Sequence, residues 1–399
     1  MKLSPRLLIA GTGVLALAAV GCSSSAGPQS GHSDSSPAAS APAGSRPAGS
    51  PSARPVGWSA ATSAAAGGGM TALIAAARKE GTLNVIGLPA SWANYGAIMK
   101  TFSKRYGIRI HSIAPGDRSP QEITEIRQDN GTAGAADVLD IEMSVAVADS
   151  KLFAPYQVAT WQAIPASQKA PDGAWVQDYG GFMSVGYNSA RFGRLTSLRQ
   201  LLGHRFSRAV ALDGNPAQAN AALYGVMMAN LALGGTANSI ASGVAFFRKL
   251  KSAGNFVPVL ATTPLTIEAG STPVVFNWDY LNTAAIVGQP ARSWKVFIPA
   301  GAAVGEFHAQ AINKDAPHPA AARLWEEFLY SQTRRGGQNL WLEGGVRPVE
   351  QAAMIANGSI DAAASHALPP GPAAAVFLTP GQAASAAAYL HAHWSRAVG

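Results

Sequence analysis

The sequence has 399 residues, of which 48% are hydrophobic and 13% are charged, so it can bury a sizeable core and has room for two medium domains. Lysine and arginine outnumber aspartate and glutamate by 30 to 22, which gives a formal net charge of +8. The basic residues are scattered along the chain singly or in pairs. Because a nucleic-acid-binding protein carries its basic residues in a clustered stripe, the sequence argues against a nucleic-acid partner.

The N-terminus has the features of an export signal. Lys2 and Arg6 precede an apolar segment, 7–20, which is too short to span a bilayer comfortably. The segment runs into "AVGC", which resembles the cleavage box of bacterial lipoproteins. We therefore expect a signal peptide over 1–21 and a lipid on Cys22, with a plain secretory leader as the alternative. Cys22 is the only cysteine, which excludes intramolecular disulfides.

A tract rich in serine, alanine, proline and glycine follows, over residues 22–69. Such a composition has almost no apolar bulk and cannot offset the entropy that is lost on ordering. We expect a flexible tether that holds a globular body away from the membrane.

After the tether, predicted helices and strands alternate. Helical runs end at glycine or begin at capping residues, and the strand-like runs are short and apolar. In chain order we expect a helix at 71–81, a strand at 82–88, a helix at 96–107, a strand at 108–113, a helix from Ser119 to about 130, strands at 136–141, 180–188 and 208–214, helices at 216–235 and 243–254, strands at 274–276, 294–301 and 306–313, and helices at 318–332 and 381–396. The alternation predicts an α/β fold with a largely parallel sheet.

Motifs of exported enzymes are absent from the sequence. It has no Gly-x-Ser-x-Gly, no His-Glu-x-x-His and no phosphate-binding loop that ends in Gly-Lys-Ser/Thr. His391 and His393 are spaced i, i+2 and do not share a helical face, so they do not predict a metal site. We expect no enzymatic activity, no cofactor and no metal. An exported enzyme and a structural surface lipoprotein are the competing classes.

Several stretches together resemble the extracellular solute-binding proteins of ABC importers. In these proteins a Lys-Glu-Gly helix end leads into the first strand and a ligand loop, which is the pattern of "ARKEGTLNVIGLPASWANYGAIMKTFSKRYGIRI". "ADVLDI" resembles their third strand, "GGFMSVGYN" and "STPVVFNWDYLN" their lobe crossings, and "APHPAAARLWEEFLYS", "GQNLW" and "GVRP" their C-terminal part. The resemblance covers roughly residues 70–360 and is closest to the iron, polyamine, thiamine and phosphonate branch, with the type 2 periplasmic-binding-protein fold.

The resemblance implies an α/β fold with two lobes and a ligand cleft between them. It places one lobe at 70–178 plus 282–306 and the other at 186–275 plus 312–399. It also implies a monomer that is lipid-anchored at the extracellular face of the cell membrane. Such a protein captures a small-molecule solute and delivers it to the ABC permease and ATPase subunits.

The return crossing at 275–282 leaves a core strand and would enter the floor of this cleft. Ligands of open α/β sheets lie beyond the carboxyl ends of strands, so the loops after the first and third strands would face the same space. The candidate ligand-binding residues are Trp92, Asn94, Tyr95, Ser144, Asn277, Trp278, Asp279 and Tyr280, with Ser91, Ser119 and Asp213 as weaker candidates.

Asp279 decides which solute we expect. A carboxylate between Trp278 and Tyr280 suits a cationic, polyamine-like solute, because ring faces also attract ammonium groups. The alternative is that Asp279 pairs with a local arginine or caps a helix that begins at Tyr280. A phosphonate-like anion would instead use a helix N-terminus such as Ser119. Ferric iron is disfavoured, because the adjacent tyrosine pair of the iron binders is missing and Tyr224 is followed by glycine.

Membrane retention tests the predicted lipid anchor. The substitution Cys22→Ser removes the thiol that would carry the lipid, so we expect the variant to leave the membrane fraction. The measurement is the distribution of the protein between pellet and supernatant after a wash without detergent. A variant that stays in the pellet would contradict lipid anchoring at Cys22.

Overall fold

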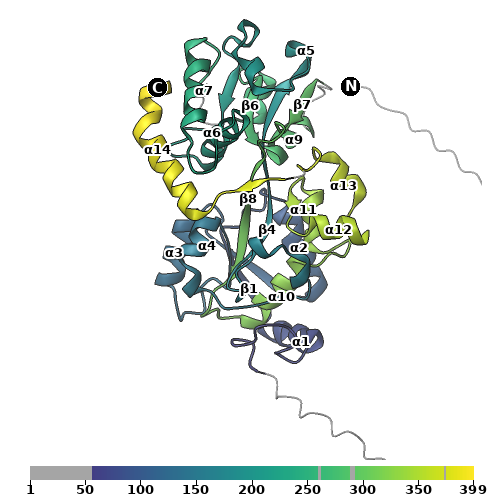
Figure 1. Ribbon diagram of the computed structural model, residues 1–399. Coiled ribbons are helices and arrows are strands. Elements are labelled where there is room, and N and C mark those ends of the chain that lie inside the picture. The colour runs from purple at the N-terminus through teal and green to yellow at the C-terminus, as the bar shows by residue number, and fades with distance from the viewer. Residues whose placement is uncertain (1–55, 259–261, 288–292, 373) are drawn as a thin grey trace, which may run out of the picture. The chain divides into compact units, whose positions relative to one another are not determined.

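The computed structural model describes residues 56–258, 262–287, 293–372 and 374–399 (Figure 1). The predicted signal peptide, Cys22 and most of the predicted tether lie outside the described residues. No helix within these ranges is long and apolar enough to cross a membrane.

The last part of the predicted tether, residues 56–69, is packed against the body. Ala61 is fully buried, and Trp58 packs on the hydrophobic core. The guanidinium of Arg323 donates hydrogen bonds to the backbone carbonyls of Ala61 (2.7 Å) and Ser59 (3.1 Å). The structure therefore differs from the prediction here, because a buried arginine holds backbone that we expected to be free.

The first sheet is built from the N-terminal strands. Strands β1 (Thr82–Ile86), β2 (Arg109–Ile113) and β3 (Val138–Ile141) are parallel and lie in the order β2-β1-β3. Strand β8 (Val304–Ile312) runs antiparallel beside β3. The residues of β1 and β3 are almost all buried, which is typical of strands that are covered on both faces.

The first two helices end where the sequence predicts. Helix α1 (Met70–Glu80) stops at Gly81, and helix α2 (Tyr95–Tyr106) stops at Gly107. Both glycines adopt the left-handed conformation, with φ of 71° and 73°, and each donates its N–H to the last turn of the helix. A glycine at this position terminates a helix because it adopts positive φ without steric cost.

The second sheet is centred on the longest strand. Strand β4 (Val176–Asn188) pairs antiparallel with β6 (Val274–Trp278) and with β7 (Trp294–Phe297). Strand β5 (Val210–Leu212) is parallel to β6. Every residue of β5 and β6 is buried, so these strands form the core of the second lobe.

Three helices belong to the second lobe. Helix α6 (Asn220–Ala232) packs on β4 and β6, and helix α7 (Ala241–Ser252) packs on α6. The C-terminal helix α14 (Pro380–Val398) lies beside α7, as Figure 1 shows in yellow and green. The chain therefore finishes on the second lobe.

The region just after β8 differs from the predicted lobe division. Helix α10 (Pro319–Leu329) packs against α1 and β1, and helix α11 (Gly337–Glu343) packs against α2. These contacts place both helices with the first sheet, although 312–399 was expected in the second lobe. The amphipathic pattern of α10 predicted a helix but did not identify the surface that it covers. Strand β7 pairs with β4 in the second sheet, although 282–306 was expected in the first lobe. The other lobe bounds remain a prediction.

The remaining helices and strands are short. They are α3 (Ser119–Gln128), α4 (Met143–Ala148), α5 (Ser189–Phe192), α8 (Pro264–Glu268), α9 (Asp279–Val287), α12 (Gln351–Asn357), α13 (Ala362–Ala367), β9 (Arg347–Pro348) and β10 (Val376–Phe377).

Strand β4 belongs to both sheets. Its first part, as far as Phe182, pairs with β8, and its second part, from Met183 to Tyr187, pairs with β6. The hydrogen-bonded strands therefore follow one path from β2 through β1, β3, β8, β4 and β6 to β5. The two α/β lobes are joined through this shared strand, and the stretch 180–188 that was expected to cross between them lies inside it.

A buried ion pair ties the crossing segments together. Arg347 Nε lies 2.7 Å from Asp279 Oδ2, and the two side chains are 2% and 0% exposed. Asp279 Oδ1 accepts hydrogen bonds from the backbone N–H groups of Phe182 and Tyr280, both at 3.0 Å. Arg347 also donates to the backbone carbonyl of Pro369. The pair therefore links β4, α9, β9 and the segment that leads to α14.

The structure decides between the two interpretations of Asp279. Its carboxylate has no exposed surface, and both oxygens are occupied by Arg347 and backbone N–H groups. Burial raises the pKa of Asp279, and Arg347 opposes that shift. Asp279 forms an ion pair, as in the alternative, but its partner is the distant Arg347 and not a local arginine. The expected ligand contact of Asp279 does not agree with the structure.

Removing the charge of Asp279 should destabilise the protein. Asp279→Asn leaves the Arg347 guanidinium buried without a counter-charge, which typically costs about 3–5 kcal/mol in free energy of unfolding. Urea denaturation measures this loss. The control is Asp149→Asn, which breaks the exposed pair of Asp149 and Arg127 and should cost less than about 1 kcal/mol. Equal, small effects of the two substitutions would contradict the structural role of Asp279.

Candidate ligand-binding cleft

Two adjoining cavities lie at the ends of strands of the first sheet, and the second of them extends to the second lobe. The first has a volume of about 520 Å³ and the second about 590 Å³, and both are lined by Arg118 and Glu142. Polar and aromatic lining residues of the first cavity include Trp92, Asp117, Ser119, Asp140, Tyr179 and His308. The second cavity also reaches residues of the second lobe, among them Asp213 and Asn220. We call the two cavities together the cleft.

The ends of strands place the acidic side chains in the cleft. Asp140 lies in β3 and Glu142 directly follows that strand, while Asp213 directly follows β5 of the second lobe. Ser119, the first residue of α3, accepts a hydrogen bond at its Oγ from the backbone N–H of Glu142 (3.0 Å). Carboxyl ends of strands are the usual position for ligand-binding residues in α/β folds.

Asp140 is the centre of a buried network beneath the first cavity. Its Oδ2 accepts hydrogen bonds from the hydroxyls of Tyr95 and Tyr179, both at 2.9 Å. His308 Nδ1 lies 3.3 Å from its Oδ1, and the imidazole stacks on the ring of Tyr179. Burial alone would lower the pKa of His308, but Asp140 and the neighbouring carboxylates outweigh it and raise the pKa to about 10. At neutral pH, His308 is therefore a cation that balances Asp140.

Glu122 lies behind the wall of the first cavity. A β-carbon on Gly87, which lines the cavity, would collide with the Glu122 carboxyl, so the two are in direct contact. Glu122 is 2% exposed, and its Oε2 has no hydrogen-bond partner among the described residues. Burial, reinforced by the charge of Asp140, raises the pKa of Glu122 to about 9. Glu122 is therefore protonated and uncharged at neutral pH.

A hydrogen bond connects β8 to the second lobe next to the cleft. Asn220, the first residue of α6, donates its Nδ2 hydrogen to Glu306 Oε2. Burial raises the pKa of Glu306 to about 7, although this hydrogen bond opposes the shift. Glu306 thus titrates near neutral pH and contributes a partial negative charge.

Carboxylates outnumber cations on the cleft wall. Asp140 is balanced by His308, whereas Asp117, Glu142 and Asp213 face only the exposed Arg118. The rings of Trp92 and Tyr179 form part of the same wall. Excess negative charge with aromatic rings suits an organic cation. Among the described residues, no group of three or more His, Cys, Asp and Glu side chains is placed to hold a metal ion.

Three of the residues singled out in the sequence line the cleft, namely Trp92, Ser119 and Asp213. Asn277 lies behind Asp213 and donates a hydrogen bond to its Oδ2 (2.9 Å). Tyr280 packs edge-on against Trp92, with ring centroids 6.2 Å apart. These two residues support the cleft wall and are not themselves among its lining residues.

The other candidates have structural contacts or lie outside the cleft wall. Trp278 packs on the ring of Tyr224 (centroids 5.2 Å apart), and Asn94 donates to the carbonyl of Leu340. Tyr95 and Asp279 are fully buried in the networks described above. Ser91 and Ser144 are exposed and do not belong to the lining of either cavity.

Sequence reasoning missed the charged residues that matter most in the cleft. Asp140 and Glu142 stand at the end of the predicted strand "ADVLDI" and directly after it, a position that could have identified them. His308 alternates with apolar residues in "EFHAQAIN", and that pattern shows which side chains share a face of the strand. Arg118, beside the predicted helix start, gave no distinguishing pattern.

The protonated state of Glu122 can be tested through the pH dependence of stability. Its pKa is near 4.5 in an unfolded chain and about 9 in the folded protein, so between these values the folded state binds more protons. The free energy of unfolding should therefore fall as pH rises from about 5 to 9, by at most about 1.4 kcal/mol per pH unit for this one group. Glu122→Gln should make the fall shallower in urea titrations at several pH values.

Glu125→Gln is the matched control for this measurement. Glu125 lies on the same helix as Glu122, but its side chain is half-exposed. We expect the control to keep the pH dependence of the parent. If Glu122→Gln and the parent have the same slope between pH 5 and 9, Glu122 is ionised in the folded protein and the assignment is wrong.

Comparison with known proteins adds to this description. No family model matches the sequence, and no curated protein matches it significantly. Among solved structures, a protein from Bordetella parapertussis described as an extracellular solute-binding protein matches with a TM-score of 0.65 and 14% identity, over 80% of this chain and 100% of that chain.

Two further solved structures are similar. A periplasmic thiamin binding protein matches with a TM-score of 0.59 and 18% identity, over 80% of this chain and 96% of its own. Iron-bound HitA from Pseudomonas aeruginosa matches with a TM-score of 0.57 and 20% identity, over 80% of this chain and 99% of that chain. At such identities the likeness establishes the fold and leaves the ligand open. The chain has the two-lobed α/β fold of the periplasmic solute-binding proteins.

Proposed function

We propose that this protein is the solute-binding component of an ABC importer, and that it captures a small organic cation of the polyamine class. The fold supports the first part, because the similar structures named above are solute-binding proteins. In this role it would deliver its solute to a membrane permease that works with ATPase subunits. We also propose that it is anchored at the extracellular face of the membrane through a lipid on Cys22, in agreement with the cleavage box in the sequence.

The single observation that supports a cationic solute is the position of Glu142 and Asp213. Glu142 follows a strand of the first lobe and Asp213 a strand of the second, yet both line the same cavity. The one cation that lines this cavity with them is the exposed Arg118. A diamine could place one ammonium group near each carboxylate, so it would gain interactions with both lobes at once. Closure of the lobes around a ligand strengthens such contacts by excluding water.

An anionic solute is the second candidate, and Arg118 is the observation in its favour. Arg118 precedes α3, whose N-terminus carries a partial positive charge and opens on the first cavity at Ser119. A phosphonate-like group could lie there. The neighbouring carboxylates of Asp117 and Glu142 would repel it, which is why we favour the cation. Ferric iron is a weaker alternative, for which HitA is the structural parallel.

Substitution of the two facing carboxylates tests the proposal. With butane-1,4-diamine and spermidine as probes in isothermal titration calorimetry, Glu142→Gln and Asp213→Asn should each weaken binding more than about tenfold, a loss of at least about 1.4 kcal/mol. Both changes keep the shape of the side chain. Asp213→Asn also replaces one of the two oxygens that accept hydrogen bonds from the Thr262 N–H and from Asn277 Nδ2. The melting temperature without ligand reports whether the variant remains folded.

Asp172→Asn is the matched control for the charge. Asp172 is exposed, lies outside the cleft lining, and accepts a hydrogen bond from the Ala174 N–H that asparagine can also accept. Asp172→Asn removes the same net charge as Glu142→Gln, but it does so outside the cleft. It should therefore leave the affinity for the diamine unchanged. If the control weakens binding as much as Glu142→Gln, the effect is a general one of net charge. If neither diamine nor triamine binds, the polyamine class is wrong, and the fold remains as described.

A further inference from the structure

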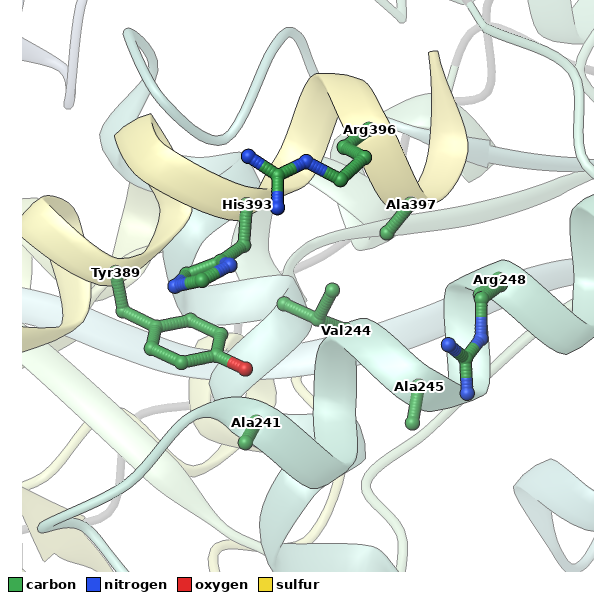
Figure 2. A pocket seen from close by; sticks show the side chains of 8 residues that line it. All are labelled: Ala241, Val244, Ala245, Arg248, Tyr389, His393, Arg396 and Ala397. Atoms are coloured by element: carbon green, nitrogen blue, oxygen red, sulfur yellow. The ribbon is translucent and has the colours of Figure 1, made fainter.

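A groove with a basic rim lies on the second lobe, where α7 and α14 pack together. Its volume is about 260 Å³. Figure 2 shows Arg248 on α7 and Arg396 on α14 on either side of it, with Val244 on its floor. His393 also lines the groove, and its ring stacks on Tyr389 with centroids 4.3 Å apart. None of the lining residues carries a negative charge.

The surroundings of the groove are also basic. Residues 189–258 contain eight lysine and arginine residues but one acidic residue, Asp213, which lies in the cleft. Helix α14 contains Arg396 and no acidic residue. The side chains of all nine basic residues are exposed. They are Arg191, Arg194, Arg199, Arg205, Arg208, Arg248, Lys249, Lys251 and Arg396.

The fold gathers most of these residues at one end of the second lobe. The segment 198–202 contacts α7, and Asn255 beyond α7 donates hydrogen bonds to the carbonyls of Leu201 and Gly203. The backbone N–H of Arg208 donates to the carbonyl of Gly254 (2.9 Å). Lys251 reaches the last residue of the chain with its ammonium group. The basic residues that are scattered in the sequence thus become neighbours in the structure.

Within the part of the chain that the structure describes, no aspartate or glutamate side chain forms an ion pair with these residues. The ion pairs found there involve Arg127, His308, His318 and Arg347, and none involves a residue of this basic end. The cleft carboxylates cannot balance the charge of these residues, because they line cavities that share no residue with the groove. We call the groove, the basic residues of 199–208 and those of α7 and α14 together the basic face.

We propose that the basic face binds the headgroups of anionic phospholipids, with Arg248 and Arg396 on opposite sides of the groove each contacting a lipid phosphate. Guanidinium groups donate paired hydrogen bonds to phosphate oxygens, and each basic side chain near an anionic membrane adds to the attraction. The apolar floor at Val244 and the ring of Tyr389 suit the boundary between headgroup and acyl chain. The second lobe would then lie against the membrane.

The exposure of its charged side chains indicates that the basic face binds a membrane and not a free phosphate compound. A tight site for a small anion surrounds it with buried donors, whereas Arg248, His393 and Arg396 are all exposed. Many exposed charges spread over one end of a lobe match a surface that presents many phosphates. The cationic solute of the proposed function would not compete, because it enters the acidic cleft.

Vesicle sedimentation tests this proposal. The full chain is mixed with vesicles of phosphatidylglycerol and phosphatidylcholine in equal parts, or of phosphatidylcholine alone, at low salt. Arg248→Gln/Arg396→Gln should reduce the partition coefficient on anionic vesicles about 30-fold, given the usual contribution of two basic side chains. Binding of the parent should also fall steeply as salt is raised. All proteins carry the same first 55 residues, so any contribution of that segment cancels.

Arg334→Gln/Arg335→Gln is the matched control. These residues are adjacent, exposed and remote from the basic face in sequence, and they form no ion pair with a described residue. The control removes the same net charge and should bind anionic vesicles within about twofold of the parent. Unchanged melting temperatures show that each variant is folded.

The other outcomes overturn the proposal. Equal loss in the groove variant and in the control would mean that total charge, and not the basic face, governs binding. Stabilisation by inorganic phosphate that disappears in the groove variant, without binding to anionic vesicles, would assign the groove to a free anion. Groove-dependent binding of a short DNA duplex without vesicle binding would assign it to nucleic acid. The groove variant should bind polyamines with the same affinity as the parent in every case. Failure of the membrane proposal is therefore distinguishable from failure of the proposed solute binding in the cleft.

Discussion

The ion pair between Asp279 and Arg347 is the constraint on which the arrangement of the two lobes depends. Both side chains are almost completely buried, and together they hold β4, α9, β9 and the segment before α14. A buried carboxylate and guanidinium stabilise the fold as a pair, because either one alone would be a desolvated charge. The segments that join the two lobes are therefore linked to one another through this pair.

Because Asp279 is buried in this ion pair, it is not available to a solute. Other residues must supply the ligand contacts. Beneath the cleft, Asp140 is paired with His308 and Glu122 is protonated, so neither offers a free charge. On its wall, the carboxyl groups of Glu142 and Asp213 are half-buried and line the second cavity. The buried acids Asp140 and Glu122 thus support the cleft wall. The half-buried acids Glu142 and Asp213, on opposite lobes, can contact a solute. The basic face of the second lobe carries the opposite charge, so one protein can attract a cation and an anionic surface at different places.

The sequence predicted the fold better than the site. Alternating helices and strands and the glycines that end α1 and α2 follow from local patterns and were found in the structure. The crossing role of the stretch in β4 was implied by the resemblance to solute-binding proteins. The partner of Asp279 could not be predicted, because Arg347 lies 68 positions away in the sequence. Likewise, the Tyr95 hydroxyl is used by Asp140, a contact that depends on how the strands are arranged. Ser119 and Asp213 looked like ordinary turn and cap residues, and only the folded chain brings them to the cleft.

The sign of the charge that the cleft prefers tests the central claim most directly. Butane-1,4-diamine and succinate have the same four-carbon length and opposite charges, so calorimetric titration of the same protein with each compares charge at nearly constant size. Excess carboxylates on both lobes predict that the diamine binds and that succinate does not, with affinity for the diamine falling as salt is raised. Binding of succinate without binding of the diamine would contradict a cationic solute and would assign the site to Arg118 and the N-terminus of α3.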